Sequence, residues 1–114
     1  MNFEKLEVWK RAARLSADLY RQLRDLNDFG FKDQITRAGL SIPSNIAEGM
    51  SREGEREKIR FLLIAKGSCA ELRTQLYIGL DVGFVPEAFA KFGIRETREI
   101  AAMLSSLIRV IRQD

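Results

Sequence analysis

Apolar residues recur along this chain at helical spacing, and no segment alternates between apolar and polar residues as a half-buried strand would. The first helical segment covers about residues 5–26. Its apolar positions follow one another at steps of three or four residues: Val8, Ala12, Leu15, Leu19, Leu23 and Leu26. Such steps place side chains on one face of a helix. Four further residues widen that face on one side: Trp9, Ala13, Ser16 and Tyr20.

The second segment, about residues 31–50, carries Ile42 and Ile46 on one face and has Pro43 between them. Proline has no N–H to donate, and its ring presses on the carbonyl four residues earlier, which belongs to Gly39. Because Gly39 has no side chain, the chain has room to bend there. We predict one proline-bent helix rather than two separate helices.

The third segment, about residues 53–82, is apolar on two adjacent sides. One stripe is formed by Ile59, Leu62, Cys69, Leu72, Leu76 and Leu80, and the neighbouring stripe by Phe61, Ala65 and Ser68. A face this wide predicts contacts beyond a single neighbouring helix. The fourth segment opens at Pro86, which suits the first turn of a helix. Its inner side carries Phe89, Ile100, Leu104, Leu107 and Ile111.

Short turns separate these segments at residues 27–30, 51–54 and 83–86, where glycine and polar residues gather. Four amphipathic helices with short connections favour an antiparallel up-down-up-down bundle. The chain has 114 residues, which is the size of one domain with one core. We predict an all-α, single-domain four-helix bundle over residues 1–114.

The residues of an active site are missing from this sequence. It contains no histidine, no glycine-rich phosphate loop and no paired cysteine motif. Cys69 lies in an apolar stripe and has no histidine to activate it, so we interpret it as a core residue. Glu53, Glu55 and Glu57 alternate by two and would splay around a helix instead of converging on a metal ion. We expect no catalysis, no cofactor and no metal.

The absence of long apolar runs bears on location. The N-terminal residues lack an apolar core, and no run approaches the roughly 18 apolar residues of a membrane span. The single cysteine cannot form an internal disulfide, which gives no reason for export to an oxidising compartment. We expect a cytoplasmic protein that does not enter the membrane.

A polar group of Arg37, Asn45 and Glu48 flanks the proline of the second segment. Asn45 and Glu48 are three residues apart and stand at the edge of the buried face. A buried charge needs a partner, and Arg37 is the nearest candidate in sequence. Two interpretations stay open: a satisfied network that stabilises the bend, or a contact with a ligand or partner.

Basic residues form a stripe on the first segment. Lys10, Arg14, Arg21 and Arg24 fall within about 80° of arc opposite the leucine stripe. The fourth segment adds Arg95 and Arg98. The formal net charge is only +3, so the stripe has two interpretations: a solvated helix face, or a contact surface for the backbone of RNA or DNA.

Aromatic residues at the borders of the apolar faces are candidates for an interface between subunits. Trp9 and Tyr20 flank the leucine stripe of the first segment, and Phe61 lies on the second apolar side of the third. Each could be an ordinary edge-of-core residue. The alternative is an interface role, since Trp and Tyr are enriched in the binding hot spots of interfaces.

Three stretches of this sequence resemble one known family. The run Ser41-Ile42-Pro43-Ser44-Asn45-Ile46-Ala47-Glu48-Gly49 resembles the signature of bacterial four-helix-bundle proteins encoded in intervening sequences of 23S rRNA genes. The opening residues Phe3, Leu6, Val8, Trp9 and Ala12 look like that family's first motif. The third-helix residues Phe61-Leu62, Ile64-Ala65, Gly67-Ser68 and Glu71-Leu72 look like another.

This resemblance implies a four-helix bundle that assembles as a ring-like homopentamer. Relatives of the family include accessory proteins of diversity-generating retroelements, which bind nucleic acid and associate with a reverse transcriptase. From the resemblance we expect a homo-oligomer that binds RNA or DNA, as an accessory to such an enzyme. A protein–protein scaffold without a nucleic-acid role is the alternative.

Overall fold

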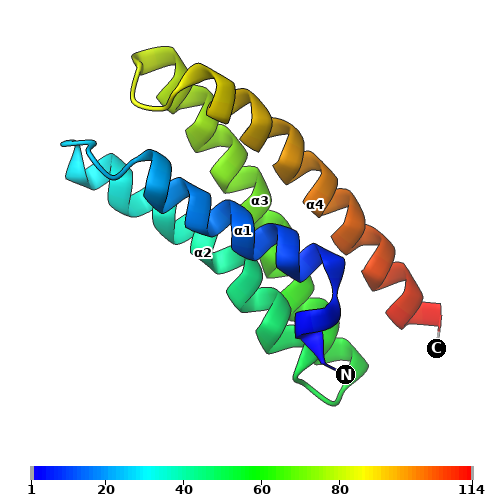
Figure 1. The fold of residues 1–114 in the computed structure, drawn as a ribbon. Helices are drawn as coiled ribbons and strands as arrows, with labels where there is room; N and C mark the ends of the chain where they lie inside the picture. Colours follow the sequence, from blue (N-terminus) through cyan, green and yellow to red (C-terminus); the bar gives the residue numbers. More distant parts are fainter. Residues whose placement is uncertain (1, 114) are drawn as a thin grey trace.

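The computed structural model describes residues 2–113, and four long helices make up most of it. A short 3-10 helix, Phe3–Lys5, precedes α1 (Glu7–Gln22), α2 (Phe29–Met50), α3 (Glu55–Val82) and α4 (Glu87–Gln113). Successive helices run in opposite directions along a rod of 46 × 20 × 19 Å (Figure 1). The predicted all-α class and its four helices are confirmed.

Each helix packs against its neighbours in the chain, and α1 closes the bundle against α4. The buried stripes are those that the apolar spacing predicts. Leu15, Leu19, Ile42, Ile46, Leu62, Leu72, Leu76, Ile100 and Leu104 are all 2% exposed or less. The core therefore follows directly from the helical period of the sequence.

Two helix ends differ from the predicted boundaries. The first helix ends at Gln22, because the N–H of Leu26 bonds to the carbonyl of Leu23 in a tighter turn. The second begins at Phe29, where the Asp28 carboxylate accepts a hydrogen bond from the N–H of Phe31 at 3.0 Å. That bond satisfies one of the free N–H groups of the first turn. Asp28 is thus a helix cap as well as a turn residue.

The α2 helix runs unbroken through Pro43, which confirms one helix in place of two. The bend itself stays a prediction. Gly39 has a further role that the sequence argument did not assign to it. A Cβ at this position would overlap Cδ1 of Leu19, so the glycine lets α1 lie close to α2.

Gly49 has the same function on the other side of α2. A Cβ there would lie 2.9 Å from Cβ of Phe61 and 3.1 Å from the carbonyl oxygen of Lys58. Both atoms are fixed to the backbone region of α3. The start of α3 can therefore approach the end of α2 only because residue 49 has no side chain.

We expect Gly49→Ala to destabilise the fold by about 2 kcal/mol, because the two helices must move apart to admit the methyl group. Gly30→Ala is the matched control in the same helix. Its Cβ would meet only the Asp28 carboxylate, at an ordinary 3.8 Å. Urea unfolding should show a lower midpoint for Gly49→Ala, and a midpoint equal to or above that of the parent protein for Gly30→Ala. Equal midpoints for the two variants would contradict the packing argument.

Candidate functional site

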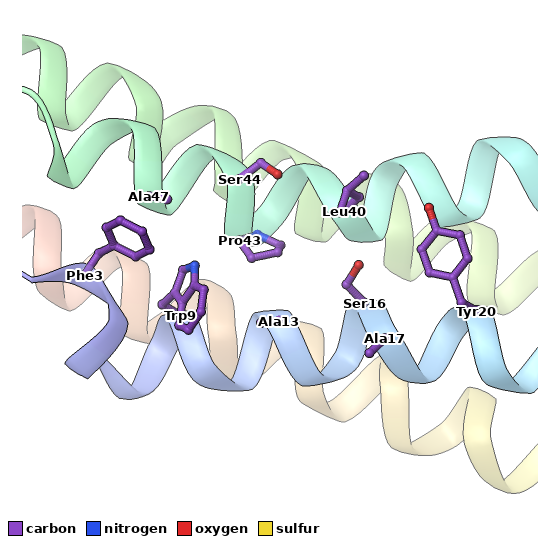
Figure 2. A pocket seen from close by; sticks show the side chains of 10 residues that line it. All are labelled: Phe3, Trp9, Ala13, Ser16, Ala17, Tyr20, Leu40, Pro43, Ser44 and Ala47. Atoms are coloured by element: carbon purple, nitrogen blue, oxygen red, sulfur yellow. The ribbon is translucent and has the colours of Figure 1, made fainter.

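An open apolar groove runs along the seam between α1 and α2. It has a volume of about 480 Å³. One wall consists of Phe3, Trp9, Ala13, Ser16, Ala17 and Tyr20, and the other of Leu40, Pro43, Ser44 and Ala47 (Figure 2). We call this the α1–α2 groove. The hollow exists because several of the facing side chains are alanine or serine, too small to fill the seam.

Aromatic residues stand at both ends of the groove. Phe3 and Trp9 pack edge to face at one end, with ring centroids 5.4 Å apart. Tyr20 is 51% exposed at the other end and also borders a second hollow next to Phe29 and Arg24. Two of the predicted interface residues, Trp9 and Tyr20, therefore lie on one continuous surface. Their role in an interface remains to be tested.

Phe61, the third predicted interface residue, lies away from this groove. Its ring packs in the hairpin between α2 and α3, under the guanidinium groups of Arg52 and Arg60 at 5.0 and 4.4 Å from the ring centroid. Cation–π contacts of this kind cover the exposed side of an aromatic ring. Phe61 thus has a packing role within the chain.

A second apolar surface lies on the solvent side of α3, far along the chain from the groove. We call it the α3 outer face. Its exposed apolar side chains are Leu63, Ile64, Tyr77, Ile78 and Val82, each 40% exposed or more. Gly67, Ala70 and Thr74 lie between them and are also exposed. The predicted second stripe is not this surface, because Ala65 and Ser68 are buried. The α3 outer face is a further apolar surface that the helical stripes of the sequence did not include.

The basic residues predicted for the first segment are all exposed: Lys10, Arg14 and Arg21 on α1, and Arg24 in the turn after it. Arg21 forms an ion pair with Asp18 at 2.7 Å. Within residues 2–113, no carboxylate lies within ion-pair distance of the other three or of Arg95 on α4. Arg98 donates a hydrogen bond to the Tyr77 hydroxyl at 2.9 Å, which directs it toward α3.

An ionic clamp between α1 and α4 was missed in the sequence argument. Nη2 of Arg11 lies 2.5 Å from Oε1 of Glu96 and 2.6 Å from Oε1 of Glu99. The hydrogen bond to Glu96, together with that to Glu99, raises the pKa of Arg11 above its ordinary value. Two features of the sequence could have indicated these ion pairs. Arg11 lies beside the leucine stripe, and α4 carries two glutamates three residues apart.

The predicted polar group of Arg37, Asn45 and Glu48 is not one cluster, and this expectation was wrong. Arg37 pairs with Asp33 at 2.9 Å and Glu48 with Arg52 at 3.0 Å. Both pairs are one helical turn long and are exposed. The charges had partners nearer than each other at the i,i+4 spacing, where side chains on a helix meet. Glu48 is therefore not a buried charge.

Of these three residues, only Asn45 belongs to a partly buried network, which joins α2 to α3. Its Nδ2 donates to the carbonyl of Ser41 at 2.8 Å and to the Ser41 hydroxyl at 2.9 Å. The Ser41 and Ser68 hydroxyl oxygens lie 2.8 Å apart. Since the Ser41 oxygen accepts from Asn45, its own proton is free to be donated to Ser68.

Cys69 is buried, and burial raises the pKa of its thiol to about 12. A thiol with that pKa holds almost no thiolate at neutral pH, so it is a poor nucleophile. Across residues 2–113, no three His, Cys, Asp or Glu side chains come together as metal ligands would. None of the described helices is both long and apolar enough to cross a membrane.

Comparison with known proteins places this fold in a family. The model of the 23S rRNA-intervening sequence protein family matches residues 4–106. The chain belongs to this family. A crystal structure of a protein of unknown function from the S23 ribosomal protein family of Bacteroides thetaiotaomicron is similar in fold, with a TM-score of 0.82. It is 23% identical, and the match covers 89% of this chain and 97% of that one. No match was found among curated proteins.

The residues that suggested the 23S rRNA-intervening sequence protein family have structural roles in this chain. Pro43 lies against α1 beside Trp9 of the opening motif (Figure 2). Ser41 meets Ser68 of the third-helix motif, and Gly49 meets Phe61. The three motifs thus hold α1, α2 and α3 together, which explains the resemblance without an active site.

We expect Asn45→Ala to lower the free energy of unfolding by about 1–2 kcal/mol, because it removes both hydrogen bonds to Ser41. Glu48→Ala is the control three residues away. Its ion pair with Arg52 is about half exposed, and such pairs contribute little. We expect its loss to change stability by less than about 0.5 kcal/mol. Urea titrations should separate the two variants, and a larger loss for Glu48→Ala would refute this assignment.

Proposed function

We propose that this 23S rRNA-intervening sequence protein is a non-enzymatic, cytoplasmic homo-oligomer that binds the backbone of RNA or DNA through its basic helix faces. The observation that carries the proposal is that four of the six predicted contact residues are exposed and have no side-chain partner within residues 2–113: Lys10, Arg14, Arg24 and Arg95. An unpaired guanidinium or ammonium group can bind a phosphate without giving up an existing ion pair.

These cations come from two helices that pack side by side. Lys10 and Arg14 are on α1, Arg24 lies in the turn that follows it, and Arg95 is on α4. The ion pair between Arg11 and Glu96 fixes α1 against α4. Arg21 and Arg98 complete the proposed contact set, although each already has a partner in this chain. A rigid pair of basic helices suits a phosphate backbone, which is read by position and charge.

Assembly would make this modest charge effective. One chain carries a net +3, and five copies at +3 each would carry +15. Repeated weak contacts on one polyanion reinforce each other through their high effective concentration. Such an oligomer would act as an accessory to a nucleic-acid enzyme, of which a reverse transcriptase is the example that the family resemblance supplies.

A protein–protein scaffold is the second candidate function, and the two exposed apolar surfaces favour it. Among residues 2–113, ten large apolar side chains are exposed. Three of them border the α1–α2 groove or the adjoining hollow, and five lie on the α3 outer face. Apolar patches on a soluble chain mark interaction sites. In this case the basic residues would serve only solubility.

A salt series with a structured RNA separates these functions. Backbone binding should weaken steeply as salt rises, because counterions are released when cations neutralise phosphates. The variant Arg14→Gln/Arg95→Gln should bind more weakly and lower the salt slope by roughly two. Arg109→Gln/Arg112→Gln removes the same charge from the end of α4 and should leave the slope nearly unchanged. No binding of the parent protein at low salt would exclude the nucleic-acid role.

The mass in solution tests the assembly separately. Light scattering at micromolar concentration should give a mass several times the 13.0 kDa of one chain, because the exposed apolar surfaces need a partner. The family resemblance favours five copies. A mass of 13.0 kDa would exclude the oligomer and with it the argument from repeated contacts.

A further inference from the structure

The α3 outer face has the pattern of a helix that packs against another helix. Two rows of side chains on this face repeat every seven residues. One row is Leu63, Ala70 and Tyr77, and the other is Ile64, Glu71 and Ile78. A seven-residue repeat keeps a row of side chains facing the same neighbour. Within this chain the rows face solvent, since Leu63, Ile64, Tyr77 and Ile78 are 40–50% exposed. A helical partner outside the chain is therefore expected.

The α1–α2 groove has the complementary shape. Two parallel walls of helix leave a channel between them, and a ridge of side chains from a third helix packs into such a channel. From Trp9 to Tyr20 the groove extends over eleven residues, or about 16 Å. Ile64 and Ile78 are fourteen residues apart, or about 21 Å. Both surfaces are apolar, and the α3 outer face is long enough to fill the groove.

The charges at the two surfaces are opposite. Lys10 follows Trp9 at one end of the groove, and Arg24 lines the hollow next to Tyr20 at the other end. On the α3 outer face the exposed charges are Glu71 and Asp81. None of these four forms an ion pair within residues 2–113. The two unpaired carboxylates of the α3 outer face can therefore pair with the two unpaired cations at the groove, although Arg98 beside Tyr77 adds one positive charge to the α3 outer face.

We propose that the α3 outer face of one copy of this protein docks in the α1–α2 groove of the next copy. The inference rests on the proposed homo-oligomer and specifies its contact. Lys10 and Arg24 then face Glu71 and Asp81 of the neighbouring copy, and in the assembled protein they leave the proposed nucleic-acid contact set. Arg14, Arg21 and Arg95 remain on the outer surface for a polyanion.

Like-with-like pairing is opposed by the same charges. Two grooves packed together would bring Lys10 and Arg24 of each copy against those of the other. Two α3 outer faces would bring their carboxylates together. Like charges across an interface cost several kcal/mol. A contact between two different surfaces leaves a free groove at one end and a free α3 face at the other, so it continues until a ring closes or a filament forms.

Two single variants test this contact, and each disables one surface. Leu40→Asp places a charge in the groove, and Ile78→Asp places one on the α3 outer face. Both native side chains are about half exposed, so the fold should tolerate the changes. Helical circular dichroism and urea unfolding check that it does. Val110→Asp is the control, since Val110 is 57% exposed on α4 and lies outside both surfaces.

Light scattering should show an oligomer for the parent protein and for Val110→Asp, and monomers for Leu40→Asp and Ile78→Asp alone. Mixing the two monomeric variants should produce a one-to-one heterodimer that grows no further. It forms because Leu40→Asp keeps an intact α3 face and Ile78→Asp keeps an intact groove. The heterodimer grows no further because its unused groove carries the Leu40→Asp change and its unused α3 face carries the Ile78→Asp change. A contact between these two surfaces would bring two aspartates together.

The possible failures are distinguishable. A monomeric parent protein would overturn the proposed assembly and this contact together. An oligomeric parent protein whose variants keep its mass, or give no heterodimer on mixing, would overturn only the head-to-tail contact. Loss of assembly in Val110→Asp would also overturn it, because that residue belongs to neither surface.

Discussion

The close approach of α2 to two neighbouring helices is the constraint on which the rest of the structure depends. Gly39 admits Leu19 of α1, and Gly49 admits Phe61 of α3. Between these two points, Ser41 forms a hydrogen bond with Ser68 across the seam with α3, and Asn45 donates to Ser41. A side chain at Gly49 would separate α2 from α3, and one at Gly39 would displace the Leu19 side chain from the core that the helices share. In this chain, the residues that resemble the signature of the family therefore have packing roles.

The constraint on α2 also determines where functional surfaces can form. The seam between α1 and α2 closes tightly at Gly39, but its outer rim carries Ala13, Ala17 and Ala47, which leave the groove open. On the opposite side, α1 contacts α4 less extensively than it contacts α2. The ion pair between Arg11 and Glu96 joins the two helices there, and the side chains are only 24% and 12% exposed. A half-buried pair with several hydrogen bonds holds position better than an exposed one, although its net stabilisation is reduced by desolvation.

Periodicity alone predicted the helices and the core, because burial of an apolar stripe is a property of each helix by itself. It could not predict contacts that depend on how two helices meet. Gly39 was interpreted as room for a bend, whereas its position opposite Leu19 shows that it makes room for a neighbour. Arg37 and Glu48 were paired with each other, but Asp33 on α2 and Arg52 just after its end are closer partners. The partners of Arg11 could be predicted only from knowledge of which residues of α4 lie opposite it.

The α1 helix contributes both to the proposed contact between copies and to the proposed nucleic-acid surface. Assembly and nucleic-acid binding are therefore coupled. Its inner rim forms a wall of the groove, and its outer side carries Arg14 and Arg21. A polyanion that spans several copies binds the assembled form better than the single chain, since only the assembly offers repeated cations. By linkage, a ligand that prefers the assembled form must also stabilise it. Nucleic acid would then act as a template for the ring as well as its ligand, with the groove contact deciding how successive copies are oriented along it.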